Sequence, residues 1–117
     1  MTVKRFEELL VWQKAKTLSV LVYKTFETSK DFGFKDQIQR ASVSVMNNIA
    51  EGFERKSDKE FVFFLNIAKG SCGEVRSMLY LALELNKISQ SDFKTLLFQS
   101  EEVSKMIFGL SKSLGRI

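Results

Sequence analysis

Four stretches of the chain repeat apolar side chains at the spacing of an amphipathic α-helix. In each stretch, residues three, four and seven apart are apolar or small, so they fall on one side of a helix. Short polar segments join the stretches, and no alternating strand-like pattern competes with them. The sequence therefore predicts an all-α fold, an antiparallel up-down-up-down four-helix bundle. Within one domain spanning residues 1–117, we expect helices at about 7–28, 34–52, 58–86 and 90–114.

The chain contains no proline, so the helix ends must be read from capping residues and glycine. Ser57 and Glu60 have the spacing of a capping box at the start of the third helix. Ser89 or Ser91 is the expected cap of the fourth helix. Gly52 is expected to end the second helix, because glycine often follows the last helical residue.

Gly70 and Gly73 lie inside the predicted third helix. Each costs about 1 kcal/mol relative to alanine in a helix interior. Either the helix breaks there, or a neighbouring backbone passes too close for a larger side chain. We favour close packing, because the apolar register continues on both sides of the two glycines.

The start of the third helix reads EFVFFL and is apolar on every side. A helix that is apolar all round must be covered on more than one face, and a four-helix bundle covers only one. Large exposed apolar patches are rare on monomers. We therefore expect self-association through an interface that includes Phe63 and Val62.

Polar residues of the second helix share one face at spacings of four, four and three: Arg40, Ser44, Asn48 and Glu51. We expect them to form a structural polar network whose members satisfy one another and fix the helix register. The alternative is a carboxylate–amide pocket with a chemical role. That alternative needs a nucleophile or a metal nearby.

The residue types argue against an enzyme. The chain has no histidine, the commonest general base and metal ligand, and only one cysteine, Cys72. A zinc site and a histidine-dependent di-iron site are therefore excluded. We expect no catalytic residue, no metal and no cofactor, with Cys72 as a small buried core residue.

The same features predict a cytoplasmic protein without a membrane role. A single cysteine forms no internal disulfide, which fits a reducing compartment. The apolar runs, such as residues 61–65, are far too short to span a membrane, and no signal peptide is evident.

The net charge of +4 and the sequence pI of about 9.3 are compatible with a polyanionic partner. Glu54, Asp58 and Glu60 dilute the basic cluster that lies between the second and third helices. Solvated lysines without a partner are the alternative interpretation of every basic residue here. The candidate phosphate contacts are Lys14, Lys16, Arg55, Lys56, Lys59, Lys105, Lys112 and Arg116.

Three segments carry a family resemblance: LLVWQKAKTLSVLVYK, QIQRASVSVMNNIAEGFER and KEFVFFLNIAKGSCGEVRSML. They resemble the four-helix-bundle proteins encoded by intervening sequences within bacterial 23S rRNA genes. They are also similar to the accessory bundle protein of diversity-generating retroelements. Met46 stands where many members have a proline, so a proline kink in the second helix is not expected. The motif positions are Trp12, Gln13, Arg40, Ser44, Asn48, Glu51, Gly52, Gly70 and Ser71.

The resemblance implies a left-handed bundle that assembles as a homopentamer around a central channel. It implies an RNA link from gene location, and the retroelement relative binds a reverse transcriptase and nucleic acid. Together, the residues and the resemblance predict a non-enzymatic oligomeric bundle that binds ribosomal RNA or another RNA or ribonucleoprotein through a basic surface. The alternative is a scaffold or adaptor that binds a protein partner and has no nucleic-acid role.

Overall fold

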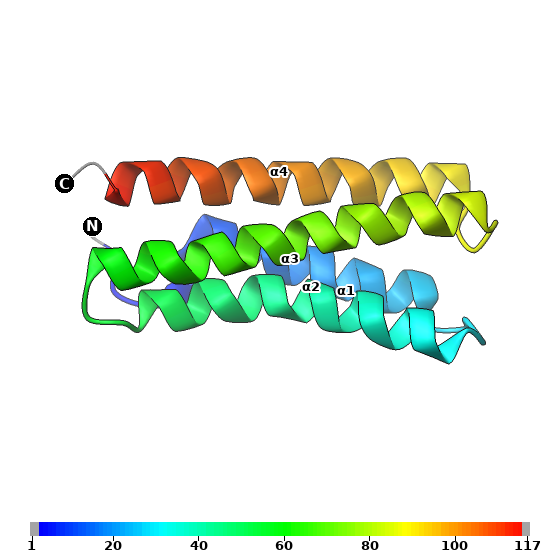
Figure 1. Ribbon diagram of the computed structural model, residues 1–117, viewed down its shortest axis with the longest axis horizontal. Helices are drawn as coiled ribbons and strands as arrows, with labels where there is room; N and C mark the ends of the chain where they lie inside the picture. Colours follow the sequence, from blue (N-terminus) through cyan, green and yellow to red (C-terminus); the bar gives the residue numbers. More distant parts are fainter. Residues whose placement is uncertain (1–2, 116–117) are drawn as a thin grey trace.

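The computed structural model describes residues 3–115, and all four expected helices are present in it. Successive helices run in opposite directions along a bundle that measures 45 × 20 × 19 Å (Figure 1). The elements in chain order are η1 (Phe6–Glu8), α1 (Leu10–Phe26), α2 (Phe32–Phe53), α3 (Asp58–Glu84) and α4 (Gln90–Leu114). The all-α bundle predicted from the apolar pattern is confirmed.

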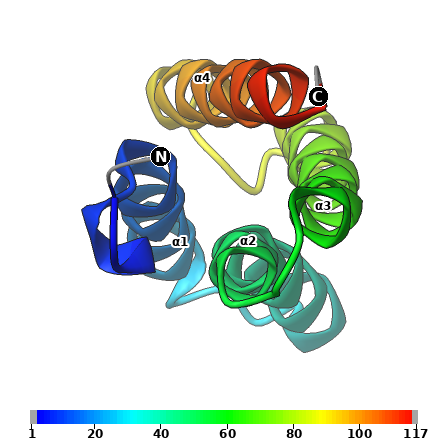
Figure 2. The same ribbon diagram turned by 90° about the vertical axis from the view of Figure 1, so that its left-hand side faces the viewer.

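The four helices are not equally close. Seen along the bundle axis, α2 lies between α1 and α3, and α4 lies beside α3 (Figure 2). The α2–α3 and α3–α4 pairs pack tightly, whereas α1 and α4 are the least closely packed of the neighbouring pairs. This unequal packing leaves one long side of the bundle more open than the others.

The core follows the apolar stripes. The stripe of α3 is buried along its whole length, from Phe61 to Ala82. Small residues let the first two helices approach: the hydroxyl of Ser19 donates to that of Ser42 at 3.2 Å, and Ser42 is fully buried. Each large aliphatic or phenyl side chain removed from water contributes about 1.5–3 kcal/mol, so the stripes account for the fold.

The helix caps follow local sequence. Ser57 accepts a hydrogen bond from the amide N–H of Glu60 at 3.1 Å, as its capping-box position predicts. Of the two serines considered for α4, Ser89 is the cap, and it accepts from the N–H of Asp92 at 3.0 Å. These side chains satisfy amide groups that the first helical turn leaves without a partner.

The end of α3 is closed by an asparagine in the left-handed conformation. Asn86 has a φ of 56°, and its N–H donates to the carbonyl of Leu83 at 3.1 Å. The N–H of Lys87 donates to the carbonyl of Ala82 at 2.8 Å, which completes a Schellman motif. Helix α3 therefore ends at Glu84, slightly before the expected residue 86.

Helix α1 begins at Leu10, later than the expected residue 7. The preceding residues form the 3₁₀ turn η1, and Leu9 is extended with its side chain buried. This break turns the ring of Phe6 onto Trp12, with ring centroids 5.2 Å apart. The burial of Phe6 and Leu9 thus stabilises this segment more than a further helical turn toward the N-terminus would.

The structure contradicts two expectations about glycines: the close packing at Gly70 and Gly73, and the end of α2 at Gly52. Helix α3 is continuous through Gly70 and Gly73, but no neighbouring backbone presses on them. A β-carbon at Gly70 would meet nothing within 4 Å, and one at Gly73 would meet only the guanidinium of Arg76 at 3.6 Å. The close approach occurs at Gly52, which does not end α2, because that helix continues to Phe53.

Candidate functional site

The polar residues of α2 separate into an inter-helix group and a solvent-facing group. Ser44 lies 2.8 Å from the hydroxyl of Ser71 on α3, and the amide nitrogen of Asn48 donates to the carbonyl and the hydroxyl of Ser44 at 2.8 and 3.0 Å. All three residues are half-buried. This group therefore links α2 to α3 through side-chain hydrogen bonds.

Arg40 and Glu51 do not join this group. Arg40 pairs with Asp36 within α2 at 2.8 Å, and Glu51 pairs at 2.9 Å with Arg55, which lies just after α2; both pairs are exposed. The structure therefore brings together two of the four expected network residues. The other two prefer partners one turn away because those partners are reached without burying a charge.

Between residues 3 and 115, no group of three or more acidic or thiol side chains is positioned to hold a metal ion. The thiol of Cys72 is buried and donates to the carbonyl of Ser100 at 3.0 Å. Burial raises the pKa of Cys72 to about 11, so the nucleophilic thiolate is scarce at neutral pH.

Several of the predicted basic residues have neighbours that reduce their availability. Lys14 pairs with Glu102 at 3.6 Å, and the ammonium of Lys16 lies 5.2 Å from the Trp12 ring centroid. Arg55 both pairs with Glu51 and stacks at 4.7 Å on Phe64.

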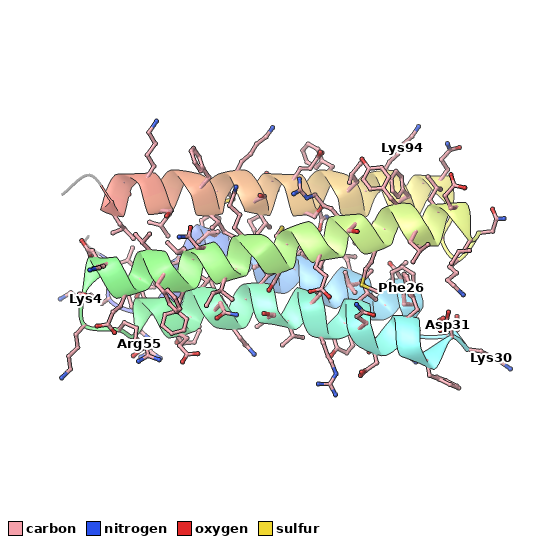
Figure 3. The ribbon with its side chains drawn as sticks, in the orientation of Figure 1. Lys4, Phe26, Lys30, Asp31, Arg55 and Lys94 are labelled. Carbon is pink, nitrogen blue, oxygen red and sulfur yellow. The ribbon has the colours of Figure 1, made fainter. Side chains whose placement is uncertain are left out.

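The basic cluster between α2 and α3 lies at one end of the bundle, on the side of Arg55 and Lys4 (Figure 3). Lys56 and Lys59 are exposed there, but the neighbouring carboxylates of Glu54 and Asp58 dilute their positive potential. Arg116 lies outside the described residues.

The remaining predicted residues, Lys105 and Lys112, belong to a wider basic surface that sequence reasoning did not assemble. On α4, positions 94, 98, 105 and 112 are separated by four, seven and seven residues, so they share an outward face. On α3, positions 69, 76 and 80 lie on the side next to α4. We call this surface the α3–α4 face; it comprises Lys69, Arg76, Tyr80, Lys94, Phe98, Lys105, Phe108 and Lys112.

The two helices contribute jointly to the α3–α4 face. The ammonium of Lys69 lies 5.6 Å from the ring centroid of Phe108, and the ring of Tyr80 packs at 5.2 Å on Phe93 of α4. Figure 3 shows Lys94 reaching outward from α4. The signal in the sequence was the spacing along α4, but the contribution of α3 appears only when the two helices are side by side.

Aromatic rings alternate with the cations on the α3–α4 face. Phe98, Phe108 and Tyr80 are 66%, 55% and 54% exposed. Such exposed rings are available for stacking. Among the described residues, no carboxylate lies within 4.0 Å of the cationic groups of this face. By sequence, Glu74 lies two residues from Arg76, Asp92 lies two residues from Lys94, and Glu102 lies three residues from Lys105.

A second, apolar surface runs along the side of α3 that faces away from the core. Phe63 and Ile67 are 60% and 40% exposed, and Leu81 and Leu85, the cap residue after α3, are 49% and 53% exposed. Gly70 and the exposed Glu74 lie on the same side between the two pairs. We call the four apolar residues the outer ridge. Val62, the other expected interface residue, is half-buried and packs against the core instead of joining the ridge.

These features define the class of protein: an all-α four-helix bundle with a basic, aromatic face and a separate exposed apolar ridge. None of the helices between residues 3 and 115 has the length and apolar character needed to cross a membrane. The chain belongs to the 23S rRNA-intervening sequence protein family, whose sequence model matches residues 7–109. The family resemblance seen in the sequence is thereby confirmed.

A solved structure has the same fold. It is the crystal structure of a protein of unknown function from the S23 ribosomal protein family of Bacteroides thetaiotaomicron VPI-5482. The two proteins are 26% identical, with a TM-score of 0.83 over 88% of this chain and 99% of that chain. A search of the curated proteins found no match.

Proposed function

We propose that this protein is a non-enzymatic RNA-binding module that contacts RNA through the α3–α4 face. The observation that supports the proposal is the row of cations on two adjacent helices, whose four lysines are exposed and which has no described carboxylate within salt-bridge distance. Phosphate contacts from such lysines supply affinity and position, and they add little sequence preference. The family's link to 23S rRNA intervening sequences makes RNA the favoured polyanion.

The proposal includes assembly. The outer ridge leaves four large apolar side chains exposed along one helix, and such patches mark protein contacts. We propose that copies of the chain cover it for one another, with the pentamer implied by the family resemblance as the working stoichiometry. Linked copies multiply a modest affinity per subunit by avidity.

The test is a salt titration of the binding of purified protein to a structured 23S rRNA fragment. The double variant Lys105→Glu/Lys112→Glu is expected to lose at least about tenfold in affinity at low salt. The slope of log affinity against log salt should fall by about one for each lysine that no longer neutralises a phosphate. A matched control, Lys24→Glu/Lys30→Glu, changes the net charge equally on residues away from the face.

A second candidate function is a protein-binding scaffold with no nucleic-acid role, and the outer ridge is the observation that favours it. Binding of the wild-type protein to RNA distinguishes the two functions, and the two double variants locate the site of RNA contact. If the wild-type protein binds no RNA even at low salt, the RNA-binding function is contradicted. If the two double variants lose affinity equally, RNA contact is spread over the whole molecule and the α3–α4 face is not the site.

A further inference from the structure

The open side of the bundle contains a cleft between α1 and α4. It has a volume of about 640 Å³, within the range of pockets that hold small organic groups. Buried Val103 lies among its lining residues. Thr17 of α1 and Phe98 and Gln99 of α4 also line it, together with Lys14 and Lys94. Because Phe98 and Lys94 also belong to the α3–α4 face, the cleft opens next to that face.

Gln99 contributes a side-chain amide whose oxygen lacks a hydrogen-bond donor in the part of the chain that the structure describes. Its Oε1 atom is buried and has no hydrogen-bond partner among the described residues. A buried acceptor left in this state costs free energy that a donor from a ligand would recover. The terminal torsion of glutamine turns readily, so the amide can present either its oxygen or its nitrogen to the cleft.

The other lining groups supply the chemistry of a nucleotide site. The 66% exposed ring of Phe98 offers a flat surface on which a base can stack. Lys94 has no described carboxylate within 4.0 Å, whereas Lys14 is paired with Glu102 at 3.6 Å. Lys94 is therefore the cation available to a phosphate at the cleft.

We propose that the α1–α4 cleft binds one unpaired base of an RNA strand that lies on the α3–α4 face. The base stacks on Phe98, its hydrogen-bonding edge meets the amide of Gln99, and the adjoining phosphate contacts Lys94. A paired base is excluded, because its edge is already occupied by the opposite strand. This inference rests on the proposed RNA-binding function and specifies the part of RNA that the protein recognises.

The test uses three RNA hairpins with the same stem: one with a single bulged adenosine, one with an abasic bulge, and one fully paired. The wild-type protein is expected to prefer the bulged adenosine over the abasic bulge by about 5- to 150-fold, the range of one stacked base. Phe98→Ala should remove that preference, and Gln99→Leu should reduce it by about 2- to 10-fold. The preference is measured as the ratio of the affinities for the bulged-adenosine and abasic hairpins, so a general effect of either change on phosphate binding cancels.

Matched controls exclude a general loss of aromatic or amide groups. Phe32→Ala removes a 70% exposed ring at the start of α2, and Gln90→Leu removes an exposed glutamine from the start of α4. Both should keep the preference for the bulged adenosine. Circular dichroism and thermal melting establish that Phe98→Ala and Gln99→Leu remain folded.

The outcomes separate this inference from the function on which it rests. If the wild-type protein binds all three hairpins equally, the base site is refuted and RNA binding stands. If it binds none of them, both the function and the site fail. If 5′-AMP alone saturates the cleft in a Phe98-dependent way while no hairpin competes with it, the occupant is a free nucleotide and the RNA base is refuted.

Discussion

Gly52 of α2 sits directly against Phe61 of α3. A β-carbon on Gly52 would lie 2.9 Å from the Cδ1 atom of Phe61 and 3.2 Å from its carbonyl oxygen. It would also lie 2.9 Å from the β-carbon of Phe64. Two of these neighbours are backbone or β-carbon atoms that cannot turn away, so the crossing of the two helices requires a glycine.

Gly52→Ala is therefore expected to lower the free energy of unfolding by about 1–3 kcal/mol, the usual cost of overpacking. This cost exceeds the gain of up to about 1 kcal/mol in helix propensity. Gly70→Ala is the matched control, because its new methyl group meets nothing within 4 Å. It should raise the stability by about 0.5–1 kcal/mol. Urea denaturation of both variants measures the two effects, and equal signs would contradict this account.

The hydroxyl pair Ser44–Ser71, supported by Asn48, is expected to couple α2 to α3. In a double-mutant cycle, Ser44→Ala and Ser71→Ala should show a coupling energy of about 0.5–1.5 kcal/mol. The value is calculated from the unfolding free energies of the wild-type protein, the two single variants and the double variant, measured by urea denaturation. Additive effects would mean that the two hydroxyl groups make no energetic link across the helices.

Asp31 should make stability depend on pH in the acid range. The N–H of Phe34, which donates to the Asp31 carboxylate at 3.2 Å, and the ammonium of Lys87 at 3.1 Å hold the pKa of Asp31 below its ordinary value of 3.8. A lowered pKa contributes stability that is complete above pH 3.8 and is lost as the pH falls through the lower, folded-state pKa. The ionised form of Asp31 is therefore the stabilising one.

Asp31→Asn keeps an oxygen that can cap α2 but removes the charge. The difference in unfolding free energy between wild type and this variant should be present above pH 3.8 and should shrink as the pH falls below that value. Urea titrations above and below that pH measure it. Lys87→Gln should reduce the same pH-dependent difference, because it removes one of the two groups that lower the pKa. A difference that stays constant with pH would refute the ionic contribution.

The outer ridge predicts the effect of one exposed charge on assembly. Phe63→Glu places a carboxylate in the ridge and should reduce the molar mass in solution, as measured by light scattering after size-exclusion chromatography. Phe32→Glu, at the most exposed of the large apolar residues that the structure describes, should leave the mass unchanged. A monomeric wild-type protein, or a Phe63→Glu variant of unchanged mass, would contradict self-association through the ridge.

Local sequence was sufficient for the presence of the four helices and for the N-terminal caps of α3 and α4. The hydroxyls of Ser57 and Ser89 act on amides only three residues away, so their roles follow from neighbours in the chain. The third stripe is buried throughout because its spacing matches the helical repeat. Such short-range features require no knowledge of which helices are adjacent.

Features that depend on two helices were misjudged or missed. Gly70 and Gly52 look alike in sequence, and only the crossing of α2 over α3 shows which of them is pressed by a neighbour. Arg40 was expected to reach Asn48 and Glu51, but Asp36 is one turn away on the exposed side. The α3–α4 face needed both the spacing on α4 and the approach of Lys69 to Phe108.

The open cleft also has a topological meaning. The first and last helices of the bundle form its walls, whereas every other pair of neighbouring helices is joined by a short turn. Widening the cleft between α1 and α4 therefore strains no turn in the described part of the chain. Helices α1 and α4 can therefore move apart on this side, while the pairs α1–α2, α2–α3 and α3–α4 stay joined by their turns.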